Sequence, residues 1–375
     1  MFARRTKPLL GVCLLLVPLV PFLSVSWVQP ALRGVGVVRR QSLSGTSSGV
    51  LLTNWKAARA QERNAKAVMM KDARLQQCTK MINACAKRNQ WRVALNILSQ
   101  AKQRQIKLDV VCYNAVISAY EKSGRWQNAL SMLGDLRPRQ LEPDVISYSA
   151  AISACEKGGQ WQEALAMLYE MRQWHVEPNV ITYNAAISAL AKCKRWHEAL
   201  GMLCEMRQRS VEATVITYSS AISACEKGEQ WEEALGILRD MREHQAEADV
   251  IIYSAAISAC EKGRQWQEAL GRLREMRQRL LKPNVFSYSA AISACEKGAR
   301  WHEALDMLHE MRQGRVVPNV IAYSSAISAC EKGERWQDAL YMLREMRQLQ
   351  SAPNVITYSA AISACEKGGP WHEAL

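Results

Sequence analysis

Acidic residues are absent from the first 61 positions of this 375-residue chain, a segment that holds eight of its 49 Lys and Arg residues. The formal net charge of +14 therefore comes largely from this segment, and the remainder carries an excess of only six positive charges. Net charge alone is thus weak evidence for a nucleic-acid partner. The chain also lacks the HxE…PCxxC pattern of zinc deaminases, and nothing in it resembles a nuclease. We therefore expect no catalysis by this chain alone, and no cofactor.

No insertion interrupts the spacing of 35 residues between nine tryptophans, which are Trp91, Trp126, Trp161, Trp196, Trp231, Trp266, Trp301, Trp336 and Trp371. A fixed period of this length is typical of solenoid proteins. The unbroken register from residue 75 onward leaves no room for a separately folded module, so we expect one long domain. Eight complete units span residues 75–354. A ninth spans residues 355–375 and stops early in its second helix, so we expect the apolar face of its first helix to be frayed or exposed.

Each unit contains two segments in which apolar residues recur at helical spacing. In one unit, Tyr148, Ile152 and Cys155 share one face of the first segment. A break at Gly158 separates it from a second helical segment, and Pro178 prevents that segment from running into the next unit. The sequence therefore predicts an all-α fold, an α-solenoid superhelix of 35-residue helix-turn-helix repeats in which neighbours cover the apolar face of each hairpin.

The N-terminal segment resembles two targeting signals in series. Residues 1–30 match a secretory signal and residues 31–53 match a transit peptide. This order resembles the bipartite presequences of algae whose plastids are reached through the secretory route, so we expect plastid localisation, with no stable membrane insertion once the presequence is removed. The alternatives are mitochondrial import and a membrane anchor, because the apolar run approaches the ~20 residues that span a bilayer. Residues 54–74 are rich in helix formers and are expected to be a linker or an N-terminal capping helix.

Seven of the twelve cysteines occupy one position of the repeat, namely Cys85, Cys155, Cys225, Cys260, Cys295, Cys330 and Cys365. Packed parallel helices would hold these residues ~8–10 Å apart, too far for disulfides, so we interpret them as small buried thiols. Cys193, His197 and Cys204 lack the fourth ligand and the paired spacing of a zinc site. No metal site is therefore predicted.

The wording of the repeat resembles the pentatricopeptide repeat family over residues 75–375. The shared features are VITYN at residues 180–184, a Lys nine residues after each Tyr, EAL, EM and a closing PN or PD. Cys78 in place of Tyr, Thr214 and Asp249 after Ala instead of Pro, and the Trp before EAL depart from the family pattern. The resemblance implies a groove of first helices that binds single-stranded RNA, not DNA, at one nucleotide per repeat.

In cellular terms, the resemblance implies a role in organellar RNA metabolism, such as processing, stabilisation or translation, with protein partners supplying any catalysis. The alternative is a protein-binding scaffold, because α-solenoids also offer concave surfaces to peptides.

The resemblance assigns base recognition to two polar positions in each unit. One follows the Tyr, about 100° around the helix from the apolar stripe, and the other closes the unit. The pairs are Thr79 with Asp109, Asn114 with Asp144, Ser149 with Asn179, Asn184 with Thr214, Ser219 with Asp249, Ser254 with Asn284, Ser289 with Asn319, and Ser324 with Asn354. Such side chains can present donors and acceptors to the edge of an unstacked base. The alternative role is cap and turn chemistry, which Asn, Asp and Ser favour.

These pairs imply a particular RNA sequence. In proteins of this kind, Ser or Thr with Asn favours adenine, Ser or Thr with Asp favours guanine, and Asn with Asp favours uracil. Asn184 with Thr214 is expected to accept a pyrimidine. Because the family reads RNA with the protein N-terminus toward the 5′ end, the expected core is 5′-GUAYGAAA-3′.

Two further positions complete the expected site. Apolar side chains two residues before the Tyr would sandwich each base, or else pack between hairpins: Val111, Ile146, Ile181, Ile216, Ile251, Phe286, Ile321 and Ile356. A lysine in every unit would follow the phosphates, or else balance the preceding Glu and the helix dipole. These lysines are Lys87, Lys122, Lys157, Lys192, Lys227, Lys262, Lys297, Lys332 and Lys367.

Overall fold

The computed structural model describes residues 74–349 and 351–368, and its elements in this part of the chain are all helical. The expected presequence and all but the last residue of the expected capping segment lie outside the described residues. A helix over residues 74–87 comes first. The first helices of the following units are α3 (Val110–Lys122), α5 (Val145–Lys157), α7 (Val180–Lys192), α9 (Val215–Lys227), α11 (Val250–Lys262), α13 (Val285–Lys297), α15 (Val320–Lys332) and α17 (Val355–Gly368).

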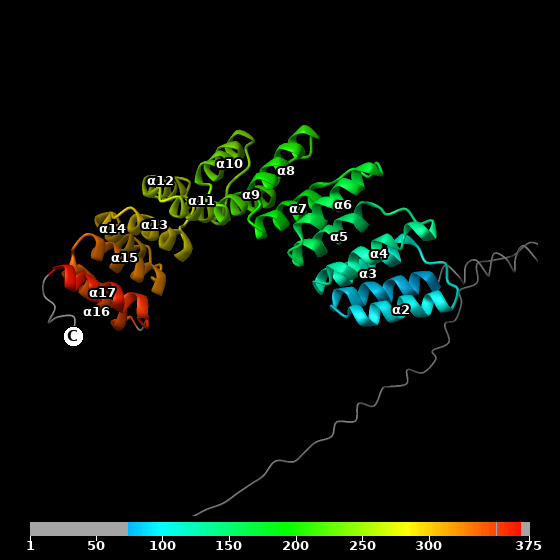
Figure 1. Ribbon diagram of the computed structural model, residues 1–375, viewed down its shortest axis with the longest axis horizontal. Helices are drawn as coiled ribbons and strands as arrows, with labels where there is room; N and C mark the ends of the chain where they lie inside the picture. Colours follow the sequence, from blue (N-terminus) through cyan, green and yellow to red (C-terminus); the bar gives the residue numbers. More distant parts are fainter. Residues whose placement is uncertain (1–73, 350, 369–375) are drawn as a thin grey trace, which may run out of the picture. The chain divides into compact units, whose positions relative to one another are not determined.

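The second helices are α2 (Trp91–Gln103), α4 (Trp126–Gly134), α6 (Trp161–Gln173), α8 (Trp196–Gln208), α10 (Trp231–Glu243), α12 (Trp266–Gln278), α14 (Trp301–Gln313) and α16 (Trp336–Gln348). Helix α4 is shorter than the others because Pro138 lies in the segment that would continue it, and a 3-10 turn, η1 (Arg137–Arg139), follows instead. Figure 1 shows first and second helices alternating from α2 (cyan) to α17 (red). The prediction of an all-α repeat solenoid is confirmed.

Each first helix packs against the first helix of the next unit and against the second helices on either side of it. The apolar stripe predicted from helical spacing forms the core of this layer, since Tyr148, Ile152 and Cys155 are all fully buried. Burial raises the pKa of the Cys155 thiol from 9.0 to about 12, as it does for Cys225. These side chains therefore act as small apolar core residues, as predicted.

The repeated Trp explains why the following unit has a glycine directly after its first helix. A Cβ atom on Gly298 would lie only 2.5 Å from Cδ1 of Trp266, so a side chain at this position would displace the indole. Trp266 also forms a cation–π contact with the following unit, because the guanidinium of Arg300 lies 4.6 Å from its ring centroid. The same Trp–Gly contact recurs between several pairs of consecutive units. The Trp before EAL therefore packs each unit against the next one.

A second link between units explains the repeated EMR wording. In the unit that begins at Val180, Tyr183 donates a hydrogen bond from its hydroxyl to Glu205 at 3.0 Å. Arg172 of the preceding unit forms an ion pair with the same carboxylate. Burial, together with the bond to Glu205, raises the pKa of Tyr183. Equivalent Arg–Glu–Tyr contacts occur around Glu275 and Glu310.

The last described helix, α17, exposes part of the stripe that other units bury. Tyr358 is 38% exposed and Ile362 is 51% exposed, whereas Tyr183 and Ile187 are fully buried. The residues after Gly368 lie outside the description.

Candidate nucleic-acid interface

The residue that closes each unit is the N-cap of the next first helix. Its side chain accepts a hydrogen bond from the backbone N–H three residues later in all eight described cases, from Asp109 through Asn354. For Asn179 this bond runs from the N–H of Thr182 to Oδ1 and is 3.0 Å long. The cap chemistry that these residue types favour is therefore confirmed, and it determines which atoms remain for a ligand.

The cap fixes the orientation of each side chain that closes a unit. Only the carbonyl oxygen of an Asn side chain can accept a hydrogen bond, so a capping Asn keeps its amide nitrogen free as a donor. A capping Asp uses one carboxylate oxygen and keeps the other as an acceptor. Asp144 illustrates this, because Oδ1 accepts both from the Ser147 backbone at 2.8 Å and from Asn114 at 3.0 Å. Asn and Asp at this position thus present opposite hydrogen-bonding groups.

The structure brings three of the eight predicted pairs into direct contact. Asn114 donates to Asp144 at 3.0 Å, Asn184 donates to Thr214 at 3.5 Å, and Ser289 donates to Asn319 at 3.0 Å. These residues are 30 positions apart in the chain, in successive first-helix layers. The predicted pairing therefore has a geometric basis in the unliganded array.

A third residue, which sequence reasoning missed, links other pairs. The hydroxyls of Ser149 and Thr182 lie 2.9 Å apart, and Thr182 donates to Asn179 at 2.8 Å. The same relay occurs through Ser287 and Thr357. The available signal was a Ser or Thr immediately before the Tyr. Ile252 occupies this position next to Ser219 and Asp249, so it cannot relay a hydrogen bond between them.

The position after the Tyr is less accessible than its place on the helix suggests. Asn114, Ser149, Ser289 and Ser324 are each 6–9% exposed, because the next first helix packs over them. The Ser149 hydroxyl also lies 2.6 Å from the carbonyl oxygen of Val145, so its single proton is available either to this carbonyl or to Thr182. These four side chains therefore offer little accessible surface to a ligand. Thr79, Asn184, Ser219 and Ser254 are half-buried.

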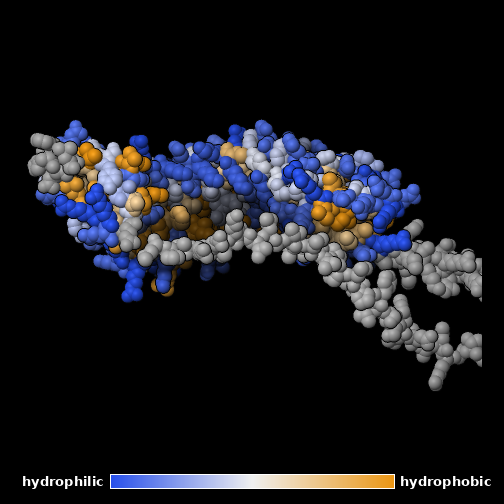
Figure 2. Space-filling model, turned by 90° about the horizontal axis from the view of Figure 1, so that it is seen from below, coloured by the Kyte–Doolittle hydropathy of each residue, from blue (hydrophilic) through white to orange (hydrophobic). Residues whose placement is uncertain are grey.

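The row of apolar side chains two residues before the Tyr is exposed throughout. Val111 is 52% exposed and Phe286 is 74% exposed, and the six isoleucines lie between these values. Packing between hairpins is therefore not their main role. Apolar side chains exposed at the same place in every unit are typical of a binding surface. Figure 2 shows apolar patches interrupting a largely hydrophilic face of the protein.

Most lysines of the row form an ion pair with a glutamate of the preceding unit. They do not pair with the glutamate that directly precedes them in the chain. The pairs are Lys157 with Glu121 at 2.8 Å, Lys192 with Glu156 at 2.9 Å, Lys262 with Glu226 at 3.0 Å, Lys297 with Glu261 at 2.7 Å, Lys332 with Glu296 at 2.6 Å, and Lys367 with Glu331 at 2.9 Å. In each of these pairs the glutamate precedes the lysine by 36 residues. The residue 36 positions before Lys122 is Ala86, and the residue 36 positions before Lys227 is Ala191. These two lysines have no ion pair among the described residues.

The cysteines near α8 do not assemble a metal site. Cys193 lies within hydrogen-bond distance of the Gly159 carbonyl oxygen at 3.3 Å, and the ring of His197 stacks on Trp196. Within the part of the chain that the structure describes, no group of three His, Cys, Asp or Glu side chains is placed to hold a metal ion. In the same residues, no helix is long and apolar enough to cross a bilayer.

Comparison with known families agrees with this architecture. The PPR repeat family matches residues 108–157, 143–192, 178–227, 248–297 and 318–367. The PPR repeat matches residues 216–245 and 286–316, and the pentatricopeptide repeat domain matches residues 73–123. The chain belongs to the pentatricopeptide repeat family. No curated protein matches it in sequence.

Solved structures share the fold. PPR10 in complex with an 18-nt psaJ RNA element is 20% identical, with a TM-score of 0.64 over 80% of this chain and 44% of that chain. PPR10 from maize is 25% identical, with a TM-score of 0.61 over 83% of this chain and 45% of that chain. The chain therefore spans less than half the length of these relatives.

Proposed function

We propose that this protein binds single-stranded RNA sequence-specifically, with one nucleotide per repeat, in organellar RNA metabolism. The observation that carries the proposal is the exposed apolar row from Val111 to Ile356, in which each member lies two residues after a polar N-cap residue. The similar protein PPR10, whose structure contains bound RNA, supports the same function for this chain.

In the proposed complex, two apolar side chains of successive units flank each base. Ile146 and Ile181, for example, are 65% and 63% exposed and belong to adjacent first helices. Their contact with both faces of a base would exclude water from its edge, which strengthens the hydrogen bonds formed there. Unstacked bases held between side chains and read at their edges are the usual targets of sequence-specific RNA recognition.

The N-cap bond supplies a physical reason for base choice. Adenine has a ring-nitrogen acceptor at its Watson–Crick edge, and it complements the free amide donor of a capping Asn such as Asn179. Guanine and uracil have a ring N–H donor there, and each complements the free oxygen of a capping Asp such as Asp144. Thr214 has a hydroxyl that both donates and accepts, so its unit selects less strictly. The expected core 5′-GUAYGAAA-3′ follows from this complementarity and from the family resemblance.

A protein-binding scaffold is the second candidate function. The observation in its favour is the neutralised lysine row, because six paired lysines attract phosphates less strongly than free ones. Under either function this chain supplies no chemistry of its own, and bound partner proteins would supply any catalysis.

Crosslinking followed by sequencing of the bound RNA would test the proposed function. We expect one enriched motif close to GUAYGAAA that survives excess competitor RNA. Purification only as a stable complex with a protein, without enriched RNA, would favour the scaffold.

The proposed location is the plastid, reached through residues 1–53. A reporter fused to residues 1–60 is expected to enter plastids by the secretory route. Retention in the cytosol or direct entry into mitochondria would contradict this proposal.

A further inference from the structure

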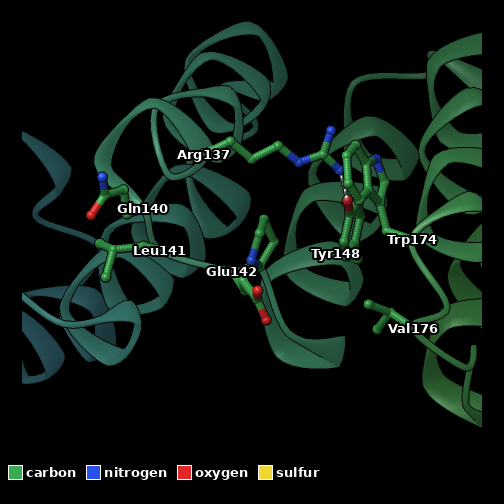
Figure 3. Close-up of a pocket in the computed structure, with 8 residues that line it drawn as sticks. Arg137, Gln140, Leu141, Glu142, Tyr148, Trp174 and Val176 are labelled. Carbon is green, nitrogen blue, oxygen red and sulfur yellow. Dashed lines mark hydrogen bonds between the residues drawn. The ribbon is translucent and has the colours of Figure 1, made fainter.

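A cavity of about 420 Å³ lies where two successive units meet, outside the row of base-reading residues. Its volume is in the range of small-molecule sites. It is lined by Arg137, Gln140, Leu141, Glu142, Pro143, Tyr148, Trp174 and Val176. Figure 3 shows that these residues come from the segment before α5, from α5 itself and from the segment after α6.

Two local features of the sequence distinguish this contact between units from the contacts between other units. Pro138 ends α4 early and is followed by η1, which shapes one wall. Trp174 supplies the other wall, at the residue that follows the second helix. The residues at the same repeat position in the other described units are Arg104, Arg139, Arg209, His244, Arg279, Gly314 and Leu349. The indole is therefore particular to this joint.

The guanidinium of Arg137 and the indole of Trp174 stack on each other at the cavity. The guanidinium lies 4.0 Å from the centroid of the indole, and Trp174 remains 58% exposed. Arg137 donates to the Tyr148 hydroxyl at 2.6 Å and pairs with Glu170 at 2.8 Å, which holds the guanidinium in place and offsets its charge. Figure 3 shows Arg137 reaching toward Tyr148 and Trp174, with Gln140 and Leu141 on the opposite side. Arg guanidinium planes and aromatic rings are the surfaces on which unstacked bases are held.

Glu142 contributes a carboxylate to the cavity. Its side chain is exposed, and it forms no ion pair within the described part of the chain. An ionised carboxylate only accepts hydrogen bonds, so the cavity calls for a ligand with adjacent donors. Leu141, Pro143 and Val176 provide apolar lining around it.

We propose that this cavity binds a guanine base. Guanine is the nucleobase whose Watson–Crick edge carries two adjacent donors, N1–H and the 2-amino group, and these fit the two oxygens of Glu142. Its ring stacks on the part of the Trp174 indole that Arg137 leaves exposed. The base belongs either to the bound RNA or to a free guanine nucleotide. Pro143, which lines the cavity, directly precedes the base-reading residue Asp144, so a base of the bound RNA could reach the cavity. Only this RNA source of the guanine rests on the proposed function.

Calorimetric titration of the full chain with nucleoside monophosphates tests the free-nucleotide source. We expect GMP to bind, IMP, which lacks the 2-amino group, to bind about ten-fold more weakly, and AMP not to bind. Trp174→Arg, which installs the residue found at position 209, and Glu142→Gln should both abolish GMP binding. Glu212→Gln, at the matched position two units later, is the control and should leave it unchanged. Circular dichroism would verify that each variant is folded.

RNAs that carry one inserted nucleotide test the RNA source. The insertion lies between the U and the A of GUAYGAAA, which the units on either side of the cavity are proposed to read. An inserted guanine should bind about ten-fold more tightly than an inserted cytosine, and Trp174→Arg should remove this difference without changing the affinity for the uninserted core. A preference for the inserted guanine without GMP binding assigns the base to RNA, and the reverse result assigns it to a free nucleotide.

The proposal is overturned if neither guanine source shows a preference, if AMP binds as well as GMP, or if Trp174→Arg binds GMP normally. Binding of a trimethyl-lysine peptide in place of GMP would also overturn it. If the protein binds no RNA at all, the proposed function fails, while the GMP titration still decides the role of the cavity.

Discussion

Asn319 accepts a hydrogen bond through Oδ1 from the backbone N–H of Ala322 at 2.9 Å, so its amide nitrogen is the atom left for a ligand. Asp would cap the same helix equally well but would present an acceptor. The choice between Asn and Asp at this position therefore changes the hydrogen-bonding group without changing the fold.

Replacing Asn284 and Asn319 by Asp should move the RNA preference from GUAYGAAA to GUAYGGGA. Each mismatched base should cost about 1–3 kcal/mol, by analogy with protein–DNA contacts. Fluorescence anisotropy with both RNAs measures the change. The control is a variant with Gln278→Glu and Gln313→Glu, which adds the same charge on exposed residues at the ends of second helices. A substituted protein that still prefers adenine at both positions would show that these residues do not read bases.

Phe286 is the most exposed side chain of the apolar row, at 74%. Phe286→Ala should weaken RNA binding by about 1–3 kcal/mol, the usual contribution of a base stacked on an aromatic ring. The melting temperature should change little, because little apolar area is lost from the core. Val317→Ala removes an equally exposed side chain outside the row and should affect neither quantity. Equal RNA affinities for the two variants would argue against the sandwich.

Gly298 and Gly271 predict opposite responses to the same substitution. A Cβ on Gly298 would approach Trp266 to 2.5 Å, whereas a Cβ on Gly271 would meet no atom within 4 Å. Gly298→Ala should therefore destabilise the array, while Gly271→Ala, inside α12, should stabilise it by about 0.5–1 kcal/mol through helix propensity. Urea unfolding of both variants measures the difference. Similar free energies of unfolding would contradict the Trp–Gly contact.

The sequence predicted the period, the two helices of each unit and the buried Tyr–Ile–Cys stripe, because these depend on spacing within one helix. It could not predict contacts between residues of different units, because these depend on how successive units stack. Lys297 follows Glu296 in the chain but pairs with Glu261, because these two side chains come together only when adjacent first helices stack. The hydroxyl relay through Thr182 was missed for the same reason, since its partners, Ser149 and Asn179, belong to the preceding unit.

Lys227 lies where a glutamate of the preceding unit would normally pair with it, but Ala191 occupies that position. Lys227→Ala should therefore weaken RNA binding and reduce the slope of log K against log salt by about 0.7, the value for one phosphate contact on a single strand. Ala191→Glu should have the same effect by supplying the missing partner. Glu261→Gln should increase the slope by a similar amount, because it frees Lys297 from its 2.7 Å ion pair. Lys297→Ala is the matched control and should alter the slope less than Lys227→Ala. Identical slopes for the unaltered protein and Ala191→Glu would assign Lys227 to the end of its own helix instead of to phosphate.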